Sequence, residues 1–180
     1  RSLRIASLLR PSARRIKAFC AQTAADAEHA RVLGIPATRI HVMGNGKYDG
    51  FPTGPIMPSP DLVGAVGQRD VVIGSLHPDE EIGFVEACRE SQLRILVAPR
   101  YVSRVQRICR LLAESNISHG LRTMGAQGCR VAILDTVGEL ASAYALAPTA
   151  IIGGTFGRRQ GQNLFEAALH NRSILFGPHH

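Results

Sequence analysis

Tryptophan is absent from this sequence of 180 residues, and aromatic residues of all kinds make up only 5% of it. Aliphatic side chains must therefore fill any core, and a hydrophobic content of 45% is enough for one. Basic runs interleaved with stacking aromatics, which are typical of nucleic-acid-binding surfaces, are also missing. The sequence therefore predicts a globular domain, or parts of two, with no nucleic-acid partner.

Cysteine is scarce, and the four that occur form no CxxC pair and no cluster with histidine. This spacing favours reduced cytosolic thiols over disulfides or metal ligands, so we expect no metal site. No apolar run is long enough to span a membrane. The sequence begins without Met or a signal peptide and stops just after an expected strand, so we expect a fragment that is cut at both ends.

Positive charge is in excess, with a formal net charge of +7. Such a balance favours anionic partners, among them a nucleotide, a phosphorylated lipid or a membrane surface. Residues 1–17 are basic and are interrupted by Pro11. They suit either a solvated amphipathic helix and loop or a helix at a membrane surface.

The most informative stretch is 151–178, in which a short apolar strand, a Gly153-Gly154 turn, a basic loop, a helix at 162–170 and a strand at 173–176 follow one another. The loop between a parallel strand and the next helix is where α/β proteins bind phosphorylated ligands. Asn163 and Glu166 lie in the first turns of this helix and can face a ligand. A plain βαβ unit, with Asn163 near the N-cap and Glu166 favouring the helix dipole, explains them equally well.

Strands and helices alternate from residue 70 onward, which predicts a parallel sheet with helices on both faces. Four blocks of polar residues fall at the carboxyl ends of the expected strands, where open α/β sheets collect ligand contacts. The blocks are Ser75/His77, Arg100, Thr136/Gly138 and 153–166.

Two of these blocks also have a simpler structural interpretation. Ser75 or His77 can cap the next helix, with Pro78 in its first turn. Thr136 and Glu139 match a capping box at the start of a helix that ends near Pro148. Arg100, at the end of a strand, is well placed for a phosphate or carboxylate.

The first part of the chain predicts a smaller α/β unit, with strands at 18–21 and 39–43 around a helix that starts at Thr23 or Ala24. The stretch 50–67 is rich in Pro and Gly and is expected to be a linker, unsuited to helix.

Several stretches resemble the signature of bacterial 3-deoxy-D-manno-octulosonic acid (Kdo) transferases. GGTF, QNLFEAAL and ILFGPH are similar to the family's GGSF, GGHNPLEPAA and VLFGPH. GSLHPDEE, DTVGEL and a terminal GNGKYD are similar to GSTHPGEE, DTMGEL and GNLKYD. The chain departs from the family at Gln162, Leu164 and Ala167, where His, Pro and Pro are usual.

The resemblance implies an α/β protein of the glycosyltransferase-B type, with the end of an N-terminal acceptor domain at 1–49, a linker at 50–67 and a truncated nucleotide-sugar-binding domain at 68–180. It implies an inverting, metal-independent transferase that moves Kdo from CMP-Kdo to a lipid A precursor and needs no cofactor. The resemblance also implies a location at the cytoplasmic face of the bacterial inner membrane, with an anionic membrane surface as a partner. The general base would lie upstream, so no catalytic residue is expected here. Lys47 is either a cleft residue that faces an anionic ligand or a solvated lysine. The donor-binding residues implied are Ser75, His77, Arg100, Thr136, Gly138, Glu139, Gly153, Gly154, Thr155, Asn163 and Glu166.

Two other interpretations stay open. The chain could belong to another nucleotide-sugar enzyme of the same type, such as a UDP-sugar transferase or epimerase. It could also be a catalytically inactive binding domain, which the departures at Gln162, Leu164 and Ala167 would suit.

Overall fold

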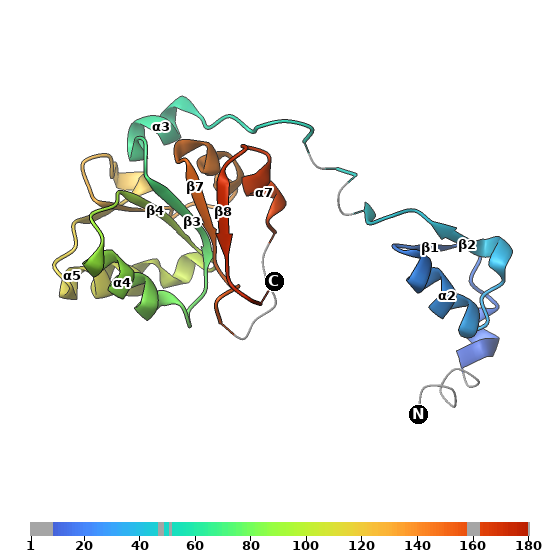
Figure 1. The fold of residues 1–180 in the computed structure, drawn as a ribbon. Helices are drawn as coiled ribbons and strands as arrows, with labels where there is room; N and C mark the ends of the chain where they lie inside the picture. Colours follow the sequence, from blue (N-terminus) through green and yellow to red (C-terminus); the bar gives the residue numbers. More distant parts are fainter. Residues whose placement is uncertain (1–8, 47–48, 51, 158–162, 180) are drawn as a thin grey trace. The chain divides into compact units, whose positions relative to one another are not determined.

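The computed structural model divides into two compact units, Arg1–Phe51 and Pro52–His180 (Figure 1). The residues that it describes are 9–46, 49–50, 52–157 and 163–179. None of the helices in these ranges is both long and apolar enough to cross a membrane.

The first unit contains a two-stranded parallel sheet, β1 (Phe19–Ala21) and β2 (Ile40–Val42), joined by α2 (Ala24–Val32). The start of α2 is fixed by Thr23, whose hydroxyl accepts a hydrogen bond from the Asp26 amide at 3.1 Å, while the Asp26 carboxylate accepts one from the Thr23 amide. The predicted strand, helix and strand of this part are confirmed, with boundaries shifted by one or two residues.

The second unit is built on a six-stranded sheet in which every pairing is parallel, with the order β5-β6-β4-β3-β7-β8. The predicted parallel sheet is therefore confirmed. Its strands are β3 (Val71–Leu76), β4 (Ile95–Pro99), β5 (His119–Leu121), β6 (Val131–Ile133), β7 (Thr149–Ile152) and β8 (Ser173–Phe176).

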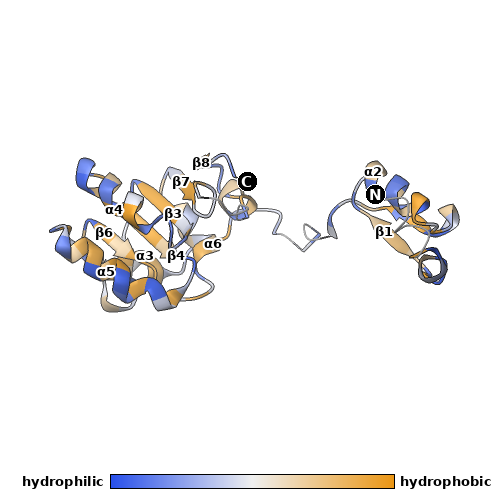
Figure 2. Ribbon diagram, turned by 90° about the horizontal axis from the view of Figure 1, so that it is seen from below, coloured by the Kyte–Doolittle hydropathy of each residue, from blue (hydrophilic) through white to orange (hydrophobic). Residues whose placement is uncertain are grey.

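Alternate strand residues point to opposite sides of this sheet, so both faces carry apolar side chains. Helices cover both faces. On one face Val72 and Leu96 pack with Leu62 of α3 (Pro60–Val66), and the same core includes residues of α6 (Leu140–Ala143) and α7 (Phe165–Ala168). On the other face Ile73 packs in a core with residues of α4 (Glu81–Glu90) and α5 (Val105–Glu114). Figure 2 shows hydrophobic colour on the central strands and both hydrophobic and hydrophilic colour on α4 and α5.

The prediction that 50–67 is a linker throughout is wrong, because its last part is the helix α3. The Ser59 hydroxyl accepts a hydrogen bond from the Leu62 amide at 3.1 Å, and Pro60 occupies the first turn, where its missing N–H costs nothing. Leu62 and Val66 are fully buried. The prolines that indicated a linker also mark the beginning of a helix.

Three helices begin later than predicted. Strand β3 continues to Leu76, so neither Ser75 nor His77 caps α4, and Pro78 precedes its first turn. Helix α6 begins at Leu140, so Thr136 is not its N-cap. Helix α7 begins at Phe165 instead of in the region of Gln162, which itself lies outside the described residues.

Candidate functional site

A cavity of about 300 Å³ with polar walls lies in the second unit. Its walls come from the end of β3 and from the segments that follow β4, β6 and β7. The lining residues are Ser75, Arg100, Gly138, Leu140, Ala141, Tyr144, Asn163 and Glu166. Five of these, Ser75, Arg100, Gly138, Asn163 and Glu166, are residues that the sequence indicated for the donor site.

The sheet topology places this cavity at a switch point. From β3 the chain passes to its neighbour β4 on one side, and it later returns to pair β7 with the other side of β3. The connections on either side of β3 therefore run in opposite directions and leave a crevice at the carboxyl ends of the strands. Ligands of open α/β sheets bind in crevices of this kind.

Arg100 supplies positive charge to the cavity. Its backbone amide donates to the carbonyl oxygen of Leu76 at 2.8 Å, which fixes the end of β4 against β3. Its guanidinium carbon lies 5.7 Å from the centre of the Tyr101 ring, within range of a cation–π contact. A guanidinium that lines a cavity suits a phosphate or carboxylate.

Asn163 and Glu166 enter from the start of α7. The Asn163 side-chain oxygen accepts a hydrogen bond from the Phe165 amide at 3.1 Å, so it stabilises the turn into α7 while its NH₂ group is left for other contacts. Glu166 is half-buried beside Tyr144. Burial, with a smaller contribution from the Glu166 charge, raises the pKa of Tyr144, so this phenol is a neutral wall of the cavity.

Tyr144 was not singled out in the sequence, although it follows Leu140 at helical spacing on the same side of its segment. The ring is 2% exposed, and a Cβ placed on Gly74 would lie 2.8 Å from its phenol ring carbon Cζ. Residue 74 must therefore be glycine for Tyr144 to reach this wall.

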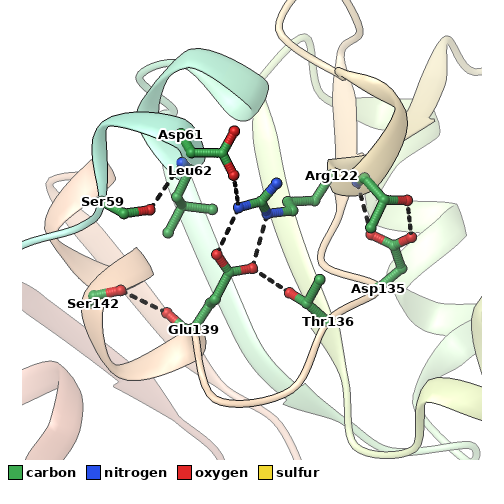
Figure 3. Close-up of polar contacts among 9 residues, drawn as sticks. Ser59, Asp61, Leu62, Arg122, Asp135, Thr136, Glu139 and Ser142 are labelled. Carbon is green, nitrogen blue, oxygen red and sulfur yellow. Dashed lines mark hydrogen bonds and ion pairs between the residues drawn. The ribbon is translucent and has the colours of Figure 1, made fainter.

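Glu139 does not line the cavity; it holds the loop that does. Its carboxylate accepts two hydrogen bonds from the Arg122 guanidinium, both at 2.8 Å, and another from the Thr136 hydroxyl (Figure 3). Arg122 also pairs with Asp61 at 2.5 Å. Chiefly through the hydrogen bonds from Arg122, the pKa of Glu139 is lowered below its usual value. The expected capping-box role of Thr136 and Glu139 is wrong, since Glu139 finds its main partner 17 residues earlier in the sequence.

Other predicted site residues lie away from the cavity lining. His77 is 4% exposed and packs edge-on to Tyr101, with ring centres 6.1 Å apart. Gly153, Gly154 and Thr155 are buried beside β8 and the β3–α4 segment. These three residues do not line the polar cavity, although Gly153 lines a larger, apolar one.

Lys47 lies outside the described residues. Within the described part of the chain, no group of three or more His, Cys, Asp or Glu side chains is arranged to hold a metal ion.

A larger cavity of about 570 Å³ lies beside α4, but its lining is mainly apolar. Asp79 and Glu80 are its only acidic groups among the described residues, and it holds no basic side chain. Burial raises the pKa of Cys88 in its wall to about 11, so that thiol is neutral. The smaller cavity, with Arg100, is the better match for an anionic ligand.

Comparison with known proteins shows what this arrangement is similar to. Residues 1–50 match the family described as 3-deoxy-D-manno-octulosonic-acid transferase (kdotransferase). A 3-deoxy-D-manno-octulosonic acid transferase of Bordetella pertussis is 30% identical over 86% of this chain, and one of Chlamydophila psittaci is 35% identical over 61% of it. The chain resembles the Kdo transferases. It spans 39% of the length of the Bordetella protein and 26% of the Chlamydophila one.

A solved structure supports the same relationship. The C-terminal CMP-Kdo-binding domain of WaaA from Acinetobacter baumannii matches 62% of this chain and 63% of its own, with 26% sequence identity and a TM-score of 0.53. Together with the six-stranded parallel sheet, this likeness to a Kdo transferase domain confirms the predicted α/β fold of the glycosyltransferase-B type.

Proposed function

We propose that residues 52–180 belong to the CMP-Kdo-binding part of a Kdo transferase. The observation that carries the proposal is the convergence of Ser75, Arg100, Gly138, Asn163 and Glu166, from four separate segments, on one polar cavity at the switch point of the sheet. The similarity to Kdo transferases in both units supports it. The protein would transfer Kdo from CMP-Kdo to a lipid A precursor, by inversion and without a metal or cofactor.

In this proposal Arg100 and Glu166 recognise different parts of the donor. The Arg100 guanidinium pairs with an anionic group, either the phosphate or the Kdo carboxylate. Glu166 would repel a phosphate, so its carboxylate accepts hydrogen bonds from the ribose hydroxyls. Gly138 adds no side chain to the cavity, which leaves space for the ligand.

The ligand preference tests the proposed function. Titration calorimetry of the chain in the presence of EDTA should give tighter binding of CMP and CMP-Kdo than of UDP and UDP-glucose. The outcome that contradicts the proposal is tighter binding of UDP, which would favour another nucleotide-sugar enzyme. Binding of no nucleotide at all would contradict the proposal as well.

The roles within the cavity can be separated with a nucleotide that lacks the ribose hydroxyls. Losing a charge-assisted hydrogen bond costs about 1.5–3 kcal/mol, so Glu166→Gln should weaken CMP binding roughly tenfold to a hundredfold. It should affect 2′,3′-dideoxy-CMP little, whereas Arg100→Ala should weaken both nucleotides or, if Arg100 binds the Kdo carboxylate, only CMP-Kdo. Glu86→Gln, an exposed carboxylate of α4 away from the cavity, is the matched control. Equal affinity of wild type and Glu166→Gln for CMP would remove Glu166 from the site.

We also propose that the protein works at the cytoplasmic face of the bacterial inner membrane, where a lipid A precursor and an anionic surface meet. The net charge of +7 supports contact with anionic lipid. Each basic residue near such a surface contributes about 1 kcal/mol and is screened by salt. Flotation with vesicles of anionic lipid across a salt series should show binding that weakens with salt, and salt-insensitive binding would contradict this part.

A further inference from the structure

One carboxylate joins the two loops that flank the switch point of the sheet. The Glu80 carboxylate, just before α4, accepts hydrogen bonds from the backbone amides of Gly154, at 2.8 and 2.9 Å to its two oxygens, and of Phe156, at 3.1 Å. It also accepts one from the amide of His77 at 3.0 Å. Three backbone N–H groups, one from the segment after β3 and two from the segment after β7, therefore converge on one anion.

These amides belong to the loop where an α/β fold ordinarily binds the phosphate of its ligand. Here an anion of the protein already occupies them. The loop also lies directly against β3: a Cβ on Gly153 would lie 2.7 Å from the carbonyl carbon of Ser75 and 2.8 Å from the Cα of Leu76. An external phosphate could therefore reach the amides of Gly154 only if Glu80 withdrew.

The segments that Glu80 joins are also the ones that shape the polar cavity. Ser75 lies five residues before Glu80 on the β3 side, with a left-handed φ of 56°. Asn163 and Glu166 follow the loop on the β7 side, and the start of that loop is held to the residue after β8, because the Thr155 hydroxyl accepts a hydrogen bond from the Gly177 amide at 2.8 Å. A change at Glu80 should therefore shift opposite walls of the cavity relative to each other.

We propose that Glu80 is a positioning residue, an internal anion that takes the place of a ligand phosphate in the glycine loop and holds the donor cavity in shape. This inference rests on the proposed function. Its consequence for recognition is that the donor's anionic group binds at Arg100, and that the amides of Gly154 and Phe156 never contact it.

Chemical rescue tests the proposal, because an anion in solution can replace the missing carboxylate. Glu80→Ala should bind CMP at least tenfold more weakly than wild type, and replacing chloride by formate at constant ionic strength should restore most of the affinity and raise the melting temperature. Wild type and Glu86→Ala should show no such response to formate, since Glu86 is an exposed acid of α4 with none of these hydrogen bonds in the described structure. A purely structural loss of packing would not respond to formate.

Several results would overturn the inference. One is wild-type affinity for CMP in Glu80→Ala, and another is an equal response to formate and chloride. Tighter binding of CMP or inorganic phosphate by Glu80→Ala would show that the freed amides are part of the ligand site.

Glu80→Gln keeps the side-chain shape and is the variant to test if Glu80→Ala does not fold. Its NH₂ group would face backbone donors, so it should bind CMP about tenfold more weakly and show no rescue by formate; unchanged affinity would overturn the inference. If wild type itself does not bind CMP, the proposed function fails, whereas the effect of formate on the melting temperature of Glu80→Ala still decides the role of Glu80.

Discussion

Two glycine-containing loops at the same edge of the sheet use glycine for opposite purposes. In the loop after β7, Gly153 is buried, and a Cβ there would overlap the backbone of Ser75 and Leu76. In the loop after β6, Gly138 is exposed, has a φ of 91°, and has nothing within 4 Å of the place where a Cβ would be. The first glycine allows its loop to touch the end of β3, whereas the second provides a backbone turn beside an open cavity.

Each loop is also held by a carboxylate, and the difference between the two explains which one faces the ligand. The Glu80 oxygens accept hydrogen bonds from amides of the loop after β7, so those amides are not available to a ligand. Glu139 is bound by the Arg122 side chain, and no hydrogen bond to the Gly138 amide is found among the described residues. A glycine motif at a strand end therefore does not by itself identify phosphate-binding amides.

Among substitutions in these two loops, the largest expected effect is a loss of stability at Gly153. The substitution Gly153→Ala forces backbone to move, because the neighbours of the new methyl group are main-chain atoms. We expect a loss of about 3 kcal/mol in the free energy of unfolding, measured by urea denaturation. Gly64→Ala on the exposed side of α3, where a Cβ meets nothing within 4 Å, is the control and should stabilise by about 0.5–1 kcal/mol. Equal stability of the two variants would contradict the assigned close contact.

A second, smaller effect concerns Glu139 and depends on pH. Its pKa is lowered in the folded state, so its stabilising contribution is complete above the unfolded pKa of about 4.3 and is lost as pH falls through the folded value. Glu139→Gln should therefore cost about 2 kcal/mol at pH 7 and progressively less below about pH 4.3. Thermal unfolding of both proteins from pH 3 to 7 measures this; a difference that does not change with pH would show that Arg122 is not the cause.

The smallest effect on stability, but a clear one on binding, is expected at Gly138. Gly138→Ala places a side chain in a left-handed conformation, which costs about 1 kcal/mol, but meets no neighbouring atom. The methyl group lies at the cavity, so CMP affinity should fall about tenfold, or about 1.4 kcal/mol. Calorimetry and denaturation on the same sample separate the two effects. Loss of stability without loss of affinity would place Gly138 outside the binding site.

Much of the fold could be predicted because local pattern and long-range structure agree. The apolar runs that became β3, β4, β6 and β7 are short, bounded by polar residues and separated by helices, which leaves few alternatives to a parallel sheet. The position of the candidate site could be predicted as far as the ends of the strands could be predicted. Any polar residue directly after such a strand, as Arg100 is after β4, falls near the crevice whatever its partners are.

The rest depended on contacts that sequence spacing does not reveal. Thr136 and Glu139 have the spacing of a capping box, but Arg122 competes for the Glu139 carboxylate from 17 residues away. Glu80 is one of three successive acids, and only the fold brings it to the amides of Gly154 and Phe156, more than 70 residues later. The sequence predicts a linker at Pro60, because the role of this proline at the start of α3 depends on the burial of Leu62 and Val66.

The most direct test of the account is a titration of the ¹⁵N-labelled chain with CMP, followed through the backbone amide resonances. The account predicts large shifts for Gly138 and Ser75, at the polar cavity, and small shifts for Gly154 and Phe156, whose amides are bound to Glu80. Large shifts at Gly154 and Phe156 with little change at Gly138 would contradict it, because the nucleotide would then bind at the glycine loop.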